Sequence, residues 1–308
     1  MWYMFALAAG SLQVVRNAAS RRLAGEVSAG LNSWARFAFN LPWALAFAAL
    51  VSHGLPSPKL SPGFFVACLL GGVGQLLANV ALVSAFRYAT FAESIVLHKL
   101  EVVLTALVGA VLFAEMPGPL GWVGIVVCAL GTAAINLAGA PGSRAMVATE
   151  FARRIVRLDR GARLALAAGG LLVVASFGVK RAMVELAEWN PEHASHLFVL
   201  PAHALVWVTG IEVLLLTAAL GVREPGAFRR VPRHMSTMST IGLTAFCSSL
   251  CWFSAFATGI VAYVRAVGQV EAVLAVAVGL WGFRERRTLR QLPGAALIVV
   301  GVLLVVLG

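Results

Sequence analysis

Charged residues are scarce in this chain of 308 residues. Asp, Glu, Lys and Arg together make up 12% of it, whereas an average soluble domain has about 25%. Thirteen residues are acidic, and 60% belong to the hydrophobic class. A soluble fold needs polar groups to cover the surface that it leaves in water. The composition therefore excludes a soluble globular enzyme and favours a protein that crosses a lipid bilayer several times.

Several motifs that indicate particular chemistries are also missing. The sequence has no HExxH zinc motif, no GxSxG nucleophile motif and no phosphate loop that ends in GK[ST]. The four cysteines lie in apolar segments, where cysteine acts as a small hydrophobic residue and indicates no disulfide framework. We therefore expect no enzymatic activity, no cofactor and no bound metal.

Basic residues are the exception to this scarcity. The chain has 24 Lys and Arg residues, which give a formal net charge of +11. They stand in short blocks between apolar runs and lack interleaved aromatic residues. This pattern indicates orientation in a membrane and attraction to anionic lipid headgroups, and it disfavours nucleic acid as a partner.

Ten apolar runs are long enough to cross a bilayer as helices, because a span needs about 20 mostly apolar residues. The sequence therefore predicts an all-α polytopic membrane protein. The ten helices are expected near residues 2–23, 34–53, 64–88, 93–113, 119–139, 163–187, 195–220, 239–261, 264–283 and 290–308.

The two halves of the chain resemble each other. An offset of 159 residues aligns LAAGSLQVV (7–15) with LAAGGLLVV (166–174). An offset of 170 residues aligns charged and small residues in the later part of each half: Glu101 with Glu271, Glu115 with Glu285, Gly124 with Gly294 and Gly131 with Gly301. We therefore expect two five-helix repeats, 1–139 and 163–308, joined by a basic linker at 140–162.

Because five is odd, consecutive repeats must enter the membrane in opposite directions, as in many secondary transporters. The arginines agree with such an inverted repeat, since they gather in alternate loops. Those arginines are Arg21, Arg22, Arg144, Arg153, Arg154, Arg157, Arg160, Arg223, Arg229, Arg230 and Arg233. The positive-inside rule places these loops in the cytoplasm of a bacterial inner membrane and both termini outside.

Motifs across nearly the whole chain resemble the EamA domain of the drug/metabolite transporter superfamily. The matching residues are Gln13, Arg16 and Asn17; Arg36, Phe37 and Pro42; Glu101, Glu115, Gly124 and Gly131; and the segments 263–271 and 283–286. The resemblance implies a permease, in many members an exporter of amino acids, metabolites or drugs. It also implies that the fourth and ninth helices line the central path. Ten-helix members are usually drawn with both termini inside, opposite to the arginine pattern here.

The fourth predicted helix carries four polar residues on one face, Ser94, His98, Glu101 and Thr105, at steps of four, three and four. The resemblance, together with the repeat, implies that Glu101 and Glu271 flank one cavity near the middle of the membrane. Ionisable groups inside a membrane are costly and mark sites by default. We expect these glutamates to bind substrate or to exchange the protons that couple transport to a gradient.

A structural role for the two glutamates is the alternative. Each glutamate then pairs with a nearby base, such as Lys99, Arg16 or Arg265, and holds helices together.

Further polar residues in the apolar runs are candidates for substrate contact, each with a structural alternative. Arg16 suits a carboxylate or phosphate, or else extends to the lipid headgroups. The others are Gln13 and Asn17, as cavity lining; Gln75 and Asn79, as a ligand site or interhelical contact; Tyr263, Arg265 and Gln269, as a gate, an anion contact or an interfacial anchor; His203, as a substrate contact; and Trp252 with Phe256, as an aromatic wall or plain packing.

Together these observations predict a secondary active transporter, an exporter of a small polar or amphipathic solute such as an amino acid, metabolite or drug. The expected mechanism is alternating access with proton coupling. The alternatives are a structural or regulatory membrane subunit and an intramembrane enzyme that modifies lipids. For the enzyme, we expect an asymmetric cluster of reactive groups in one half, whereas the polar groups here recur in both halves.

Overall fold

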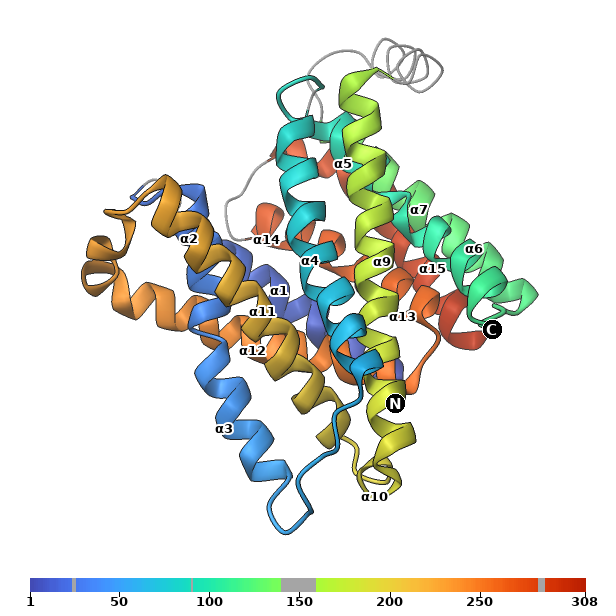
Figure 1. Cartoon of the computed structure of the whole chain (residues 1–308). Helices are drawn as coiled ribbons and strands as arrows, with labels where there is room; N and C mark the ends of the chain where they lie inside the picture. The colour runs from blue at the N-terminus through green and yellow to red at the C-terminus, as the bar shows by residue number, and fades with distance from the viewer. Residues whose placement is uncertain (24–25, 90, 140–158, 282–285) are drawn as a thin grey trace. The chain divides into compact units, whose positions relative to one another are not determined.

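The structure is a computed structural model that describes residues 1–23, 26–89, 91–139, 159–281 and 286–308. All regular elements in these ranges are helices (Figure 1). The α-helices are α1 Trp2–Leu23, α2 Ala29–Ala38, α3 Leu41–Val51, α4 Pro62–Ala85, α5 Phe91–Lys99, α6 Glu101–Leu112, α7 Pro119–Gly139, α9 Arg160–Trp189, α10 Pro191–Ala194, α11 Val199–Arg223, α12 Met235–Thr258, α13 Val261–Gly268, α14 Val270–Trp281 and α15 Leu292–Leu307. The 3-10 helices are η1 Ala227–Arg230, η2 Pro232–His234 and η3 Arg286–Gln291.

Nine segments of the described chain are long and apolar enough to cross a membrane. The chain is therefore a helical multi-pass membrane protein, as the composition predicts. The first predicted span, α1, has 22 residues but is not among the nine. Its polar residues Gln13, Arg16 and Asn17 lower its hydropathy. A total of ten spans therefore stays a prediction.

Three of the predicted helices are interrupted. One span contains α2 and α3, which meet at Phe39 and Asn40 just before Pro42. A second contains α5 and α6, which meet at Leu100, and a third contains α13 and α14, which meet at Gln269. Pro42 explains the first interruption, because proline has no N–H to donate. Hydropathy did not predict the interruptions, because it measures how apolar a segment is and not which backbone hydrogen bonds the segment makes.

The described residues form two compact units. Unit 1 consists of residues 1–73 and 176–258, and unit 2 consists of residues 74–175 and 259–308. Each unit therefore draws on both halves of the sequence. Most of the predicted linker, 140–158, lies outside the described residues, as does 282–285 with the predicted Glu285 match.

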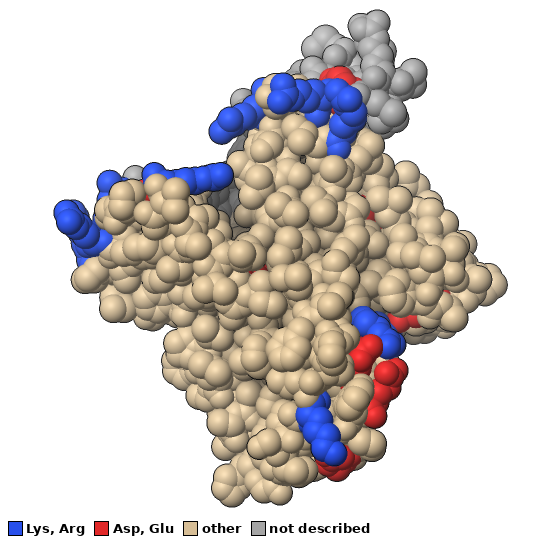
Figure 2. All heavy atoms as spheres, viewed as in Figure 1, with Lys and Arg blue, Asp and Glu red and all other residues tan. Residues whose placement is uncertain are grey.

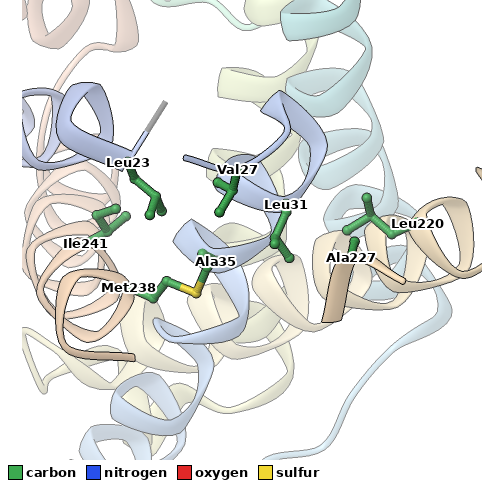
Figure 3. Packing of buried hydrophobic residues seen from close by; sticks show 8 residues of the cluster. All are labelled: Leu23, Val27, Leu31, Ala35, Leu220, Ala227, Met238 and Ile241. Carbon is green, nitrogen blue, oxygen red and sulfur yellow. The ribbon is translucent and has the colours of Figure 1, made fainter. Parts of the chain in front are cut away.

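Unit 1 has an apolar core where α1, α2, α11 and α12 meet (Figure 3). The eight buried residues of this core are Leu23, Val27, Leu31, Ala35, Leu220, Ala227, Met238 and Ile241. Leu31 and Ala35 are four residues apart, so one face of α2 packs into the core. This leaves the adjacent face of α2 for other contacts.

Unit 2 is held by a close contact of α7 with α15. A Cβ atom placed on Gly124 would lie 2.7 Å from the carbonyl oxygen of Gly301. One on Gly131 would lie 2.8 Å from the carbonyl oxygen of Gly294. The residue numbers rise along one helix as they fall along the other, so the two helices are antiparallel. Glycine is required at these positions because no side chain fits between the backbones.

Most of the exposed arginines lie near helix ends, and Figure 2 shows basic side chains in separate groups on a largely uncharged face. In unit 1 four of them stand at and after the end of α11: Arg223, Arg229, Arg230 and Arg233. In unit 2 they lie where α4 ends and α9 begins, at Arg87, Arg160 and Arg163, and the Arg160 guanidinium lies 4.6 Å from the ring centre of Tyr88. The sides of the helices expose many large apolar residues. This distribution suits apolar sides in lipid and basic ends in the headgroups.

The variant Gly301→Ala tests the contact of α7 with α15. Its Cβ would lie 2.6 Å from Cys128 Sγ and 2.8 Å from the carbonyl oxygen of Gly124. We expect the helices to separate and the free energy of unfolding to fall by about 1–3 kcal/mol. The measurement is thermal unfolding of the purified protein in detergent.

The control for this experiment is Gly210→Ala in α11, because nothing lies within 4 Å of a Cβ at that position. Its melting temperature should equal or exceed that of the wild type, since alanine favours helix. Equal melting temperatures for Gly301→Ala and Gly210→Ala would contradict the close contact of α7 with α15.

Candidate functional site

Two helix interruptions in unit 2 have nearly the same geometry. Leu100, between α5 and α6, has φ −60° and ψ −12°, and Gln269, between α13 and α14, has φ −62° and ψ −11°. A regular α-helix has ψ of about −42°. The amide of Leu100 bonds to the carbonyl of Leu97 at 3.3 Å, and that of Gln269 to the carbonyl of Ala266 at 3.1 Å. Both helices therefore tighten into a three-residue turn, which often marks a functional hinge.

Charged residues stand on both sides of each turn. Lys99 lies in the last turn of α5 and Arg265 in the last turn of α13. Glu101 lies in the first turn of α6 and Glu271 in the first turn of α14. A cation is favoured at a helix C-terminus and an anion at an N-terminus. Each interruption therefore suits the charges that flank it.

The four charged side chains form two ion pairs. Lys99 Nζ donates a hydrogen bond of 2.9 Å to Glu271 Oε1. Arg265 Nε lies 3.8 Å from Glu101 Oε2. The side chain of Glu101 is 1% exposed, and the other three are between 14% and 22% exposed. The ion pairing that we proposed as the structural alternative is confirmed for Lys99 and Arg265.

Each ion pair joins the first half of the sequence to the second. The glutamates are matched by the offset of 170 residues, but the bases are not, because this offset places Gln269 opposite Lys99 and Ile95 opposite Arg265. The carboxylates thus follow the repeat, whereas the bases break it. Two acids and two bases balance each other when all four are ionised.

The predicted polar face of the fourth helix is buried in unit 2. Ser94, His98, Glu101 and Thr105 are exposed by 0%, 8%, 1% and 0%. The hydroxyl of Thr105 donates to the carbonyl of Glu101 at 2.6 Å. Ser94 Oγ, His98 Nδ1 and Glu101 Oε2 have no hydrogen-bond partner among the described residues. Of these three atoms, Glu101 Oε2 has the ion pair with Arg265 as its polar contact.

No protein-family model matches the chain, and no curated protein matches it. A solved structure named "Crystal structure of protein" is similar to it, with a TM-score of 0.73 and 18% sequence identity. The similarity covers 99% of this chain and 97% of the other. It shows a shared fold along the whole chain, and the EamA resemblance stays a prediction.

Neighbouring helices hold both interruptions. The hydroxyl of Thr132 in α7 donates to Gln269 Oε1 at 3.2 Å, and Gln269 Nε2 donates to the carbonyl of Arg265 at 3.3 Å. At the other interruption, Gly169 of α9 packs against His98. A Cβ on Gly169 would lie 2.9 Å from the carbonyl oxygen of His98. The turns are thus fixed by α7 and by a glycine in α9.

Tyr263, in α13, contacts the turn between α6 and α7. Its hydroxyl accepts a hydrogen bond of 2.8 Å from the amide of Gly118. The Glu115 carboxylate from the same turn accepts one of 2.8 Å from the amide of Val261, the first residue of α13. These contacts connect α13 to this turn. Glu115 is a motif residue of the repeat, and its contact with α13 did not follow from the sequence.

Not all candidate residues belong to this site. Gln75 and Asn79 lie in unit 2 on α4, where Gln75 is half-buried and Asn79 is exposed. The other candidates belong to unit 1: Gln13, Arg16, Asn17, His203 and Trp252.

The unit 1 candidates have their own contacts. Arg16 is 6% exposed, and its Nη2 donates to Asn17 Oδ1 at 2.9 Å. His203 Nε2 lies 2.9 Å from Ser52 Oγ, which accounts for its polar nitrogen without a substrate. Trp252 packs on Phe256 with ring centres 5.7 Å apart. These contacts are compatible both with a substrate contact and with a structural role for each residue.

Unit 1 also holds a buried charge that sequence reasoning missed. Glu212 in α11 is 1% exposed, and its charge acts on the Arg36 guanidinium of α2. Arg36 entered the sequence analysis as a motif residue only. Glu212 is the one acidic residue between Val199 and Arg223. The rule that intramembrane ionisable groups mark sites would have identified it.

The variant Gly169→Ala tests whether α9 fixes the interruption beside Glu101. The added methyl group would meet the carbonyl of His98, and we expect a loss of about 1–3 kcal/mol in unfolding free energy. Thermal unfolding measures the loss. The matched control is the next residue, Gly170, where a Cβ meets nothing within 4 Å. Equal melting temperatures for the two alanine variants would contradict the contact.

Proposed function

We propose that the protein is a secondary active transporter of the EamA type, an exporter of a small polar or amphipathic solute. The observation that carries this proposal is the pair of ion pairs at the two interrupted helices. Glu101 with Arg265, and Glu271 with Lys99, each connect the two halves of the sequence. The proposal locates substrate and proton binding at these groups.

The energetic argument concerns charges inside a membrane. Such groups are costly to bury, and paired charges repay the loss of hydration incompletely. Close packing of small residues would hold the helices together at lower cost. Four charges at two interruptions are therefore better explained by function. Discontinuous helices whose ends face ions or substrates are a recurring feature of secondary transporters.

Breaking and re-forming of the ion pairs provides a mechanism for alternating access. A proton on Glu271 removes the attraction that holds Lys99, and a charged group of the solute competes with either pair in the same way. The halves of the sequence then lose one connection and gain freedom to rearrange about the hinges at Leu100 and Gln269. Release of the proton or solute restores the pair. Proton coupling in this scheme needs no cofactor or metal.

The antiparallel contact of α7 with α15 supports the inverted repeat in this proposal. A two-fold axis that exchanges Gly124 with Gly294 and Gly131 with Gly301 also exchanges the two contacts of these glycines. Two oppositely oriented copies would pack in this way. The shared fold over 99% of the chain fits a single architecture from end to end.

The chemistry of the site bears on the solute. Its two acids and two bases suit a zwitterion or a small polar molecule, and the carboxylates also suit an organic cation that exchanges for protons. We place the protein in a bacterial inner membrane with both termini outside. Support for this orientation comes from the exposed arginines after α11 and before α9.

Transport by the purified protein in proteoliposomes tests this proposal. The panel consists of amino acids, organic cations and phosphate esters, each with and without a pH gradient. We expect flux of at least one class above that of empty vesicles, and faster flux with the gradient. Flux that ignores the gradient would remove proton coupling from the proposal. No flux for any class would count against transport.

The variant Glu101→Gln tests the role of the buried carboxylate. Glutamine keeps the size of the side chain but loses the charge that faces Arg265. We expect transport to be abolished while the protein still reaches the membrane and elutes as a single species. The control is Glu188→Gln, at the exposed end of α9, where Arg181 pairs with Glu185 as well as with Glu188. Full activity of Glu101→Gln would overturn the role assigned to this residue.

A further inference from the structure

Three polar residues of unit 1 follow one another from α2 to the start of α3. Asn32 and Arg36 are four residues apart on one face of α2, and Asn40 comes four residues later, directly before α3. Each contributes a buried polar atom with no hydrogen-bond partner among the described residues: Asn32 Oδ1, Arg36 Nε and Asn40 Oδ1. Asn40 is 1% exposed. We call these three residues the α2 polar row.

Other helices of unit 1 enclose the α2 polar row. Asn32 Nδ2 donates a hydrogen bond of 3.0 Å to the carbonyl of Ser20 in α1. The negative charge of Glu212 in α11 acts on Arg36. Gly72 of α4 allows a close approach to Glu212, because a Cβ there would lie 3.4 Å from Glu212 Cγ. The buried atoms of the row and the side chain of Glu212 therefore lie inside unit 1.

Such an arrangement is unfavourable without further partners. A buried polar atom that makes no hydrogen bond costs several kcal/mol in a membrane. The row repeats this cost at each of its three residues. The asparagine oxygens need a donor, whereas Arg36 Nε–H needs an acceptor. Water provides both and takes part in two to four hydrogen bonds when buried.

We propose that the α2 polar row binds a file of water molecules that leads to Arg36 and Glu212. The water hydrates these two opposite charges inside the membrane and gives the Glu212 carboxylate a route for proton exchange. This site belongs to unit 1 and is distinct from the paired charges of unit 2. The proposal does not depend on transport, because it concerns hydration of the resting protein.

Thiol reactivity tests the proposal, because the thiolate is the reactive form of cysteine and it forms in water. Asn40→Cys and Ala35→Cys are introduced separately into a variant in which alanine replaces the four native cysteines. Ala35 is the matched control: it lies in the same candidate membrane span, is 0% exposed and packs in the apolar core near Met238 (Figure 3). The probe is N-ethylmaleimide, which crosses lipid and reacts with thiolates.

We expect Asn40→Cys to react about tenfold faster than Ala35→Cys in proteoliposomes without solute, because only the first thiol meets water. Equal rates would overturn the proposal. Gel filtration checks that each variant is folded, and Asn32→Cys provides the same test if Asn40→Cys does not fold. Loss of transport activity has no bearing on this result, so the proposed function fails or succeeds separately.

Discussion

The two ion pairs that connect the first half of the sequence to the second are the interaction on which the rest of unit 2 depends. Glu101 lies beside Arg265, and Glu271 beside Lys99. In each pair the base ends one short helix and the acid begins another, so the interruptions and the charges stabilise each other. A continuous helix would lose this match between charge and helix end. The interruptions are therefore part of the site.

Close packing is the second constraint, and glycine provides it. Helices in lipid gain little from apolar contact alone, since lipid tails are as apolar as leucine. Their association then relies on backbones that approach closely. Gly124 and Gly131 serve this purpose between α7 and α15, and Gly169 serves it where α9 meets the first interruption. The charged site is thus held by contacts that tolerate no added methyl group.

Hydropathy predicted the helices well, because burial in lipid demands long apolar runs. Helical spacing predicted one face for Ser94, His98, Glu101 and Thr105, and all four residues are buried, on both sides of the interruption at Leu100. The interruptions did not follow, because they arise from backbone bonding and tertiary contact with α7 and α9.

Partner choice among the charges was equally hidden from the sequence. The sequence offered three bases for the two glutamates and gave no distances between helices. Glu212 was overlooked because the repeat, and not each single acid in an apolar run, guided the search. The contact of Glu115 with α13 depends on a turn whose path only the folded chain defines.

The most direct test of the central claim compares Lys99→Gln, Glu271→Gln and the double variant for stability and transport. Each single variant leaves a partly buried charge without its partner and should be destabilised, whereas the double variant should melt near the wild type. If the Lys99–Glu271 ion pair must break and re-form during transport, the stable double variant will not transport. A double variant that transports like the wild type would contradict the account and assign the pair a purely structural role.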